Sequence, residues 1–152
     1  MYSAVLLIHS WVRWAAVVAG LAATVLAFTS RSEAPGPTRV DRWGLIYLIT
    51  LDIQLLLGLL LYFALSPNTA AIFTNFGAVM RDPGARFWAV EHITLMLVAA
   101  VLVHVGRMLA RKAATPGAKR TRLLVCFTLA TIAMLIAIPW PGMRAGRPLF
   151  RM

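Results

Sequence analysis

The sequence predicts an all-α fold, a transmembrane four-helix bundle whose helices run up, down, up and down. Two observations carry this prediction. Of the 152 residues, 61% are hydrophobic and only 13% are charged, whereas a soluble domain carries about 25% charged residues. The apolar residues also gather in long runs, and about 20 consecutive apolar residues in a helix cross the hydrocarbon core of a bilayer. The composition therefore argues against a soluble enzyme, and the single cysteine, Cys126, cannot form an internal disulfide.

Four apolar runs are the expected spans of one membrane domain, residues 1–152. They cover residues 2–28, 43–65, 87–110 and 123–138. The first run has no basic segment before it and is too long for the apolar part of a signal peptide, so we expect it to stay in the mature protein. The last run ends where Pro139 and Pro141 stop the helix.

The segments between the runs have the composition of loops. Residues 30–42 and 111–122 combine proline and glycine with many charges, and residues 66–86 contain an Arg-Asp-Pro-Gly turn signal. All three are expected to be loops.

The basic residues predict the orientation of the chain, because cytoplasmic loops carry an excess of Lys and Arg. Nine basic residues lie on the side of the first and third loops: Arg31, Arg39, Arg42, Arg107, Arg111, Lys112, Lys119, Arg120 and Arg122. Six lie toward the other side: Arg13, Arg81, Arg86, Arg144, Arg147 and Arg151. In a bacterium this bias places both termini in the periplasm and the two basic loops in the cytoplasm. The net charge of +10 is then explained by topology and lipid headgroups, and no nucleic-acid partner is expected.

Two histidines are expected at one depth of the bundle. At 1.5 Å per residue, His9 lies roughly 10 Å and His92 about 9 Å from mid-span on the outer side. They lie on the first and third helices, which are diagonal partners in such a bundle. Facing histidines of this kind can be the axial ligands of a b-type haem, which needs no covalent attachment motif. The less favoured metal ligand is His104, which lies on the inner side about 9 Å from mid-span.

Other residues are candidates for the surroundings of a haem. Arg13, one turn below His9, and Arg86, at the outer mouth of the third helix, could meet its propionates. Small residues on the first helix leave room for a ring or for a close helix neighbour: Ala15, Ala16, Ala19, Gly20 and Ala23.

The charged residues of the spans admit two interpretations. Arg13 needs a partner near mid-depth, and the acids of the spans are Asp52 and Glu91, so an Arg13–Glu91 or Arg13–Asp52 pair is expected. Alternatively, Glu91 and His92 accept protons beside a bound quinol, whose oxidation releases them. Gln54 is interpreted as a residue that packs helices together.

Four segments together resemble a group of short bacterial four-span proteins labelled cytochrome b subunits or cytochrome-b-like proteins. They are HSWVRW at 9–14, DIQLLLG with LYF at 52–63, RFWAVEH at 86–92 and IPWP at 138–141. The resemblance covers nearly the whole chain and implies a membrane protein that binds haem or is linked to quinone. Larger di-haem cytochromes b carry two histidines, thirteen or fourteen residues apart, on each of two helices. Here His92 and His104 are twelve apart and the first helix has only His9, which leaves one haem or none.

Two functions therefore remain as expectations. The first is a small b-type-cytochrome-like protein of the bacterial inner membrane that transfers electrons in connection with the quinone pool. The alternative is an accessory subunit, without chemistry of its own, of a larger respiratory or photosynthetic membrane complex. In both cases the partners are membrane lipid and other membrane subunits of a redox complex, and a free-standing enzyme is less expected. A transporter is disfavoured because four short spans without repeats leave little room for a pathway.

Overall fold

The computed structural model describes residues 1–30 and 38–150, and these form helices, turns and an extended tail without any strand. This confirms the all-α prediction. The long helices are α1 (Tyr2–Thr29), α2 (Arg39–Leu60), α6 (His92–Arg111) and α7 (Pro116–Ala137). Between α2 and α6 lie two π-helical turns and three short helices: η1 (Leu61–Leu65), α3 (Pro67–Thr74), α4 (Phe76–Arg81), α5 (Pro83–Arg86) and η2 (Phe87–Glu91).

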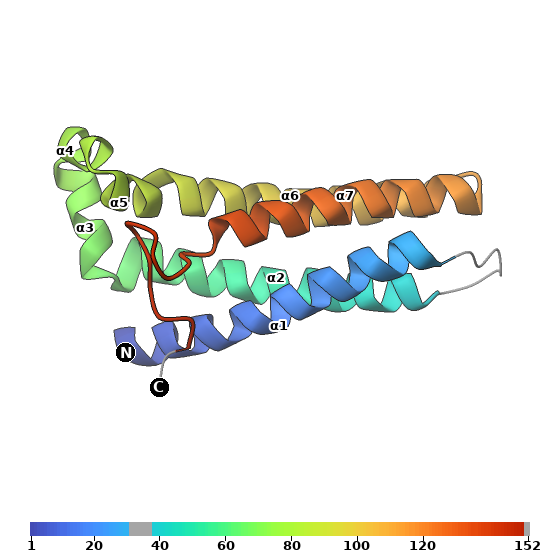
Figure 1. Ribbon diagram of the computed structural model, residues 1–152, viewed down its shortest axis with the longest axis horizontal. Coiled ribbons are helices and arrows are strands. Elements are labelled where there is room, and N and C mark those ends of the chain that lie inside the picture. The colour runs from blue at the N-terminus through green and yellow to red at the C-terminus, as the bar shows by residue number, and fades with distance from the viewer. Residues whose placement is uncertain (31–37, 151–152) are drawn as a thin grey trace.

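The four long helices lie side by side along the longest axis of the molecule, and the chain follows them in alternating directions (Figure 1). Helix α1 packs against α2 and α7, and α6 packs against the same two helices, so α1 and α6 are diagonal partners. Four helical stretches are long and apolar enough to cross a membrane: Tyr2–Thr29, Arg39–Leu65, Pro83–Arg111 and Pro116–Ala137. The chain thus has the helices of a multi-pass membrane protein.

Capping residues set where the helices begin, which is earlier than the apolar runs suggest. Thr38 and Asp41 form a capping box, in which each side chain accepts a hydrogen bond from the other residue's backbone N–H. Thr115 caps α7, whose first residue is proline, so α7 begins at Pro116 although its apolar run begins at 123. Within the expected loop 30–42, residues 31–37, including Arg31, lie outside the described residues.

The prediction of a loop at residues 66–86 is wrong, because most of this segment is helical. Its turn-forming residues mark helix starts. Pro67 opens α3, the Asn75 side chain accepts from the Ala78 N–H to cap α4, and Asp82 accepts from Gly84 and Ala85 to cap α5. Proline favours both turns and the first turn of a helix, because its φ is fixed and it has no N–H to satisfy. Asparagine and aspartate favour both as well, because their side-chain oxygens accept from nearby backbone N–H groups. The composition could not separate the two.

The small residues of α1 serve close helix packing. Ala16, Ala19, Gly20 and Ala23 are buried, while Ala15 faces outward. A Cβ on Gly20 would lie 2.9 Å from the ring of Tyr47, so only glycine lets α2 approach this closely. The Tyr47 ring also meets Phe127 of α7 edge to face, with ring centroids 5.9 Å apart. Of the two roles expected for these residues, the structure shows the close neighbour.

Basic residues tie the helix ends together at the end of the bundle where α7 begins. Arg120 Nε donates to the Ala27 carbonyl at the end of α1 (3.0 Å), and Arg122 Nη1 donates to the Leu109 carbonyl near the end of α6 (2.6 Å). Lys119 pairs with Asp41 of α2 at 2.7 Å. The last carbonyls of a helix have no partner inside it and favour positive charge. The basic residues here therefore help to hold the helix ends together.

The chain after α7 returns to α1 at the opposite end of the bundle, which also holds the N-terminus (Figure 1). Pro139 cannot continue α7, and Gly142 turns the chain with a φ of +92°, a conformation that favours glycine. The Leu149 carbonyl then accepts hydrogen bonds from Arg13 Nη2 (2.7 Å) and Trp14 Nε1 (3.1 Å). Phe150 stacks on Trp14 with centroids 5.4 Å apart. We call residues 138–150 the tail.

Candidate functional site

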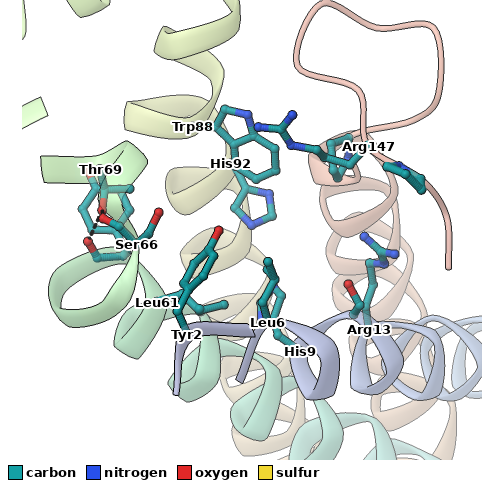
Figure 2. Close-up of a pocket in the computed structure, with 15 residues that line it drawn as sticks. Tyr2, Leu6, His9, Arg13, Leu61, Ser66, Thr69, Trp88, His92 and Arg147 are labelled. Atoms are coloured by element: carbon teal, nitrogen blue, oxygen red, sulfur yellow. Dashed lines mark hydrogen bonds between the residues drawn. The ribbon is translucent and has the colours of Figure 1, made fainter. Parts of the chain in front are cut away.

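A cavity of about 310 Å³ lies at the end of the bundle that holds the tail. Its walls come from α1, the end of α2 with η1, the start of α3, η2, α6 and the tail (Figure 2). Its lining residues with polar side chains include His9, Arg13, Trp88, His92 and Arg147. Leu6 and Leu61 are among its apolar residues. A cavity of this size suits a small organic ligand or part of a larger one.

His92 presents one ring nitrogen to this cavity. Its Nδ1 lies 2.7 Å from the Ala137 carbonyl. Because a carbonyl can only accept, Nδ1 carries the proton, and in neutral imidazole Nε2 then holds a lone pair. Nε2 forms no hydrogen bond with any residue in the described part of the chain. The ring extends from α6 beside Trp88 and toward α1 (Figure 2). This is the arrangement that prepares a histidine to bind a metal or to accept a proton.

His9 occupies the facing wall, but its Nε2 is engaged. It lies 3.1 Å from Gln54 Nε2, and Gln54 is only 2% exposed. His9 Nδ1 and Gln54 Oε1 are buried without a hydrogen-bond partner among the described residues. Gly58 lies against the His9 ring, where a Cβ would be 3.2 Å from Cε1. His9 could therefore bind a ligand through Nε2 only if it released Gln54.

Two arginines give the cavity a positive wall. Arg13 lines it from α1, and its Nη2 binds the Leu149 carbonyl of the tail. Arg147 lines it from the tail, with its guanidinium carbon 5.7 Å from the centre of the Trp88 ring. The described lining contains no carboxylate. An anionic group on a ligand would be attracted to this wall.

The expected pairing of Arg13 with Glu91 or Asp52 is wrong. Glu91 binds Arg86 at 2.8 Å, and Asp52 faces His104 at 3.4 Å. Among the described residues neither acid forms an ion pair with Arg13. The tail supplies the Leu149 carbonyl instead, a backbone acceptor that no count of charged side chains reveals.

The π-helical turns shape the cavity. Turn η1 ends α2 and contributes Leu61 and Tyr62, and turn η2 precedes α6 and contributes Trp88. The Tyr62 hydroxyl donates to the Ala89 carbonyl at 2.8 Å and joins the two turns. A π-helical turn holds an extra residue and often occurs at functional sites.

Only some of the site residues predicted from the sequence line the cavity. His9, Arg13 and His92 line it. Arg86 and Glu91 are half-exposed, bind each other, and are not lining residues. His104 lies elsewhere and contacts the Ala100 carbonyl and Asp52.

Three residues that the sequence does not assign to the site contribute to it. Gln54, expected to hold helices together, does so by contacting His9 of α1. Trp88 resembled a member of the interfacial aromatic belt, and Arg147 belongs to a tail whose course no helical period describes. Only Gln54 carried a usable signal, since a buried amide in a span needs a polar partner.

The arrangement offers a ligand one free imidazole nitrogen, two guanidinium groups and apolar walls. Among the described residues no group of three or more His, Cys, Asp or Glu side chains is placed to hold a metal ion, but a porphyrin iron takes only axial ligands from the protein. Comparison of the chain with family models, curated proteins and solved structures finds no match.

Proposed function

We propose that the protein is a small b-type-cytochrome-like protein that transfers electrons in connection with the quinone pool. The observation that supports it is His92: its Nδ1 is fixed by the Ala137 carbonyl and its Nε2 is free at a cavity opposite His9. When bound there, a b-type haem would supply reversible one-electron transfer. We further propose that the protein resides in a bacterial inner membrane, with both termini in the periplasm and other membrane subunits of a redox complex as partners.

The residues of the cavity fit this group with one adjustment. His92 Nε2 would bind the haem iron without rearrangement. His9 Nε2 would bind it after releasing Gln54. Arg13 and Arg147 would bind the propionates, a role for which Arg147 replaces Arg86 because Arg86 is bound to Glu91. Trp88, Leu6 and Leu61 would exclude water from the ring.

The test is a dithionite-reduced minus oxidised visible spectrum of the protein purified in detergent, with and without added hemin. We expect the sharp α-band of a low-spin b-type haem at about one haem per chain. His92→Ala should abolish haem binding, and His9→Ala should convert low-spin haem to high-spin or lose it. His104→Ala is the matched control and should keep the wild-type spectrum. A flat spectrum at adequate protein concentration, after hemin addition, would reject the proposal.

A second candidate is a quinol-binding protein without haem. The His9–Gln54 contact favours it, because it occupies the Nε2 lone pair of His9 and leaves the imidazole lone pair of His92 Nε2, enough to accept one quinol O–H but not to form a bis-histidine site. A quinol gives up two protons and two electrons on oxidation, so His92 would accept one proton, water would take the second, and a redox partner subunit would accept both electrons. Haem-free protein should then bind a short-chain quinone analogue, and His92→Ala should weaken this binding at least tenfold. If neither hemin nor the quinone analogue binds, an accessory-subunit role is favoured.

A further inference from the structure

An acid–base pair lies on the outside of the bundle, away from the cavity. Asp52 Oδ2 of α2 is 3.4 Å from His104 Nε2 of α6, and the two side chains are 36% and 52% exposed. Asp52 is at the midpoint of the membrane-spanning stretch Arg39–Leu65. The other ion pairs of the described residues, Arg86–Glu91 and Lys119–Asp41, lie at the ends of their stretches.

The pair interrupts two apolar stripes with the same spacing. On α2 the stripe is residues 45, 49, 52 and 56, and on α6 it is residues 97, 101, 104 and 108. Each steps by four, three and four residues. The apolar members are all exposed: Leu45 45%, Ile49 47%, Leu56 66%, Leu97 42%, Val101 58% and Met108 48%. Steps of four and three place side chains in one row on a helix, and this row is the contact seam of helices that pack side by side. We call the two stripes the α2–α6 face.

Contact of the α2–α6 face with lipid is unfavourable, because the face carries an ionisable pair. Ionisable side chains at mid-membrane are costly when they face hydrocarbon, and they usually face protein or a polar cavity. The Asp52 carboxylate can accept about four hydrogen bonds, yet its contact in the described structure is the long one to His104. His104 Nδ1 is already bonded to the Ala100 carbonyl, so Nε2 is the nitrogen left to interact. A protein surface that offers further donors to Asp52 would satisfy the carboxylate.

We infer that the α2–α6 face binds a second copy of this chain. The face carries an acid on one helix and a base on the next, so it is complementary to itself under a two-fold rotation, as a symmetric dimer requires. Copies inserted in one orientation must be related by an axis along the membrane normal. That axis brings α2 of one copy against the antiparallel α6 of the other, and Asp52 of one copy to the partner's His104. The inference does not depend on what the cavity binds.

The register of this contact makes it testable by cross-linking. Leu56 follows Asp52 by four residues and Val101 precedes His104 by three, so on antiparallel helices they lie at one level, about one turn from the pair. In a Cys126→Ala background, a His-tagged Leu56→Cys chain is co-expressed with a Strep-tagged Val101→Cys chain and oxidised in native membranes. We expect a disulfide-linked band of twice the chain mass that carries both tags. The control replaces Val101→Cys with Val18→Cys on α1, since Val18 is also 58% exposed, and should give no such band.

Three outcomes would overturn the inference. They are an absence of cross-linked dimer, equal cross-linking of the Val18→Cys control, and a disulfide to a protein of another mass at Val101→Cys. The last would show that a different membrane subunit covers the face. A charge exchange tests the pair itself: Asp52→His alone should lower the cross-linked fraction at least fivefold, and Asp52→His with His104→Asp should restore it. No loss in the single variant would contradict the role assigned to the pair.

Discussion

His9 and His92 show how the neighbours of a side chain decide what it can do. Both are histidines on diagonal helices and both line one cavity. The Ala137 carbonyl accepts a hydrogen bond from Nδ1 of His92, which leaves Nε2 free. Gln54 Nε2 donates to Nε2 of His9. A histidine that binds through its second nitrogen is oriented by the bond its first nitrogen makes. His92 is therefore oriented for binding, and His9 is held back by an amide.

A substitution at Gly58 tests whether the position of the His9 ring matters for ligand binding. In Gly58→Ala the new Cβ would lie 3.2 Å from Cε1 of His9 and push the ring by a few tenths of an ångström. Alanine also favours the helix by about 0.5–1 kcal/mol, so we expect little change in the free energy of unfolding. The bound haem should instead show a lower low-spin fraction, measured by the visible spectrum.

The matched control is Gly77→Ala in α4, where an added Cβ meets no atom within 4 Å. It should keep the wild-type spectrum. A Gly58→Ala protein with the same low-spin fraction as Gly77→Ala would show that the position of His9 has no bearing on the site.

At the scale of elements, small residues let the helices approach each other closely. Gly106 of α6 packs against Cys126 of α7, where a Cβ on Gly106 would lie only 2.5 Å from the Cys126 Cβ. Inside a membrane, association of helices depends on such packing, because lipid tails are as apolar as the side chains. Cys126 thus acts in the described structure as a small packing residue.

We expect Gly106→Ala to destabilise the α6–α7 pair. The two Cβ atoms cannot coexist at this distance, and overpacking typically costs about 1–3 kcal/mol. Unfolding in mixed micelles with increasing SDS measures the loss. The exchange Gly106→Ala with Cys126→Gly moves the Cβ from one helix to the other and should recover most of the stability. If the double variant is as unstable as the single, the close approach is not the cause.

At the scale of the molecule, the N-terminus, the cavity and the tail share one end of the bundle (Figure 1). The end of α1 lies at the other end, together with the basic start of α2, end of α6 and start of α7. An even number of spans puts both chain ends on one side of a membrane. The greater number of basic residues lies at the far end, and the positive-inside rule then predicts that the cavity end faces the periplasm.

We predict this orientation as a measurable outcome. Alkaline phosphatase fused after Met152 should be active, because it folds only outside the cytoplasm, and green fluorescent protein fused there should stay dark. The same reporters fused after Ala114, in the segment between α6 and α7, serve as the control and should give the reverse result. A fluorescent fusion at Met152 would invert the proposed orientation.

From the sequence alone one can predict the helical class and the number of long apolar helices. The rise per residue also gives His9 and His92 one expected level, with Arg13 one turn below His9. These follow from hydropathy and from a constant rise per residue, which are local properties of a helix. Helix starts at Thr38, Asp82 and Thr115 could have been anticipated from capping residues but were obscured by their turn-like composition.

Which groups meet depends on how the helices and the tail pack. The tail crosses from α7 to α1, gives Arg13 a backbone carbonyl and brings Arg147 to the cavity. Gln54 reaches His9, and Asp52 meets His104 on the outer face. Each of these contacts joins segments far apart in the chain. A buried polar side chain needs a hydrogen-bond partner, and the sequence shows that need. The identity of the partner depends on how the helices rotate and approach each other. Small residues such as Gly20, Gly58 and Gly106 together allow that approach.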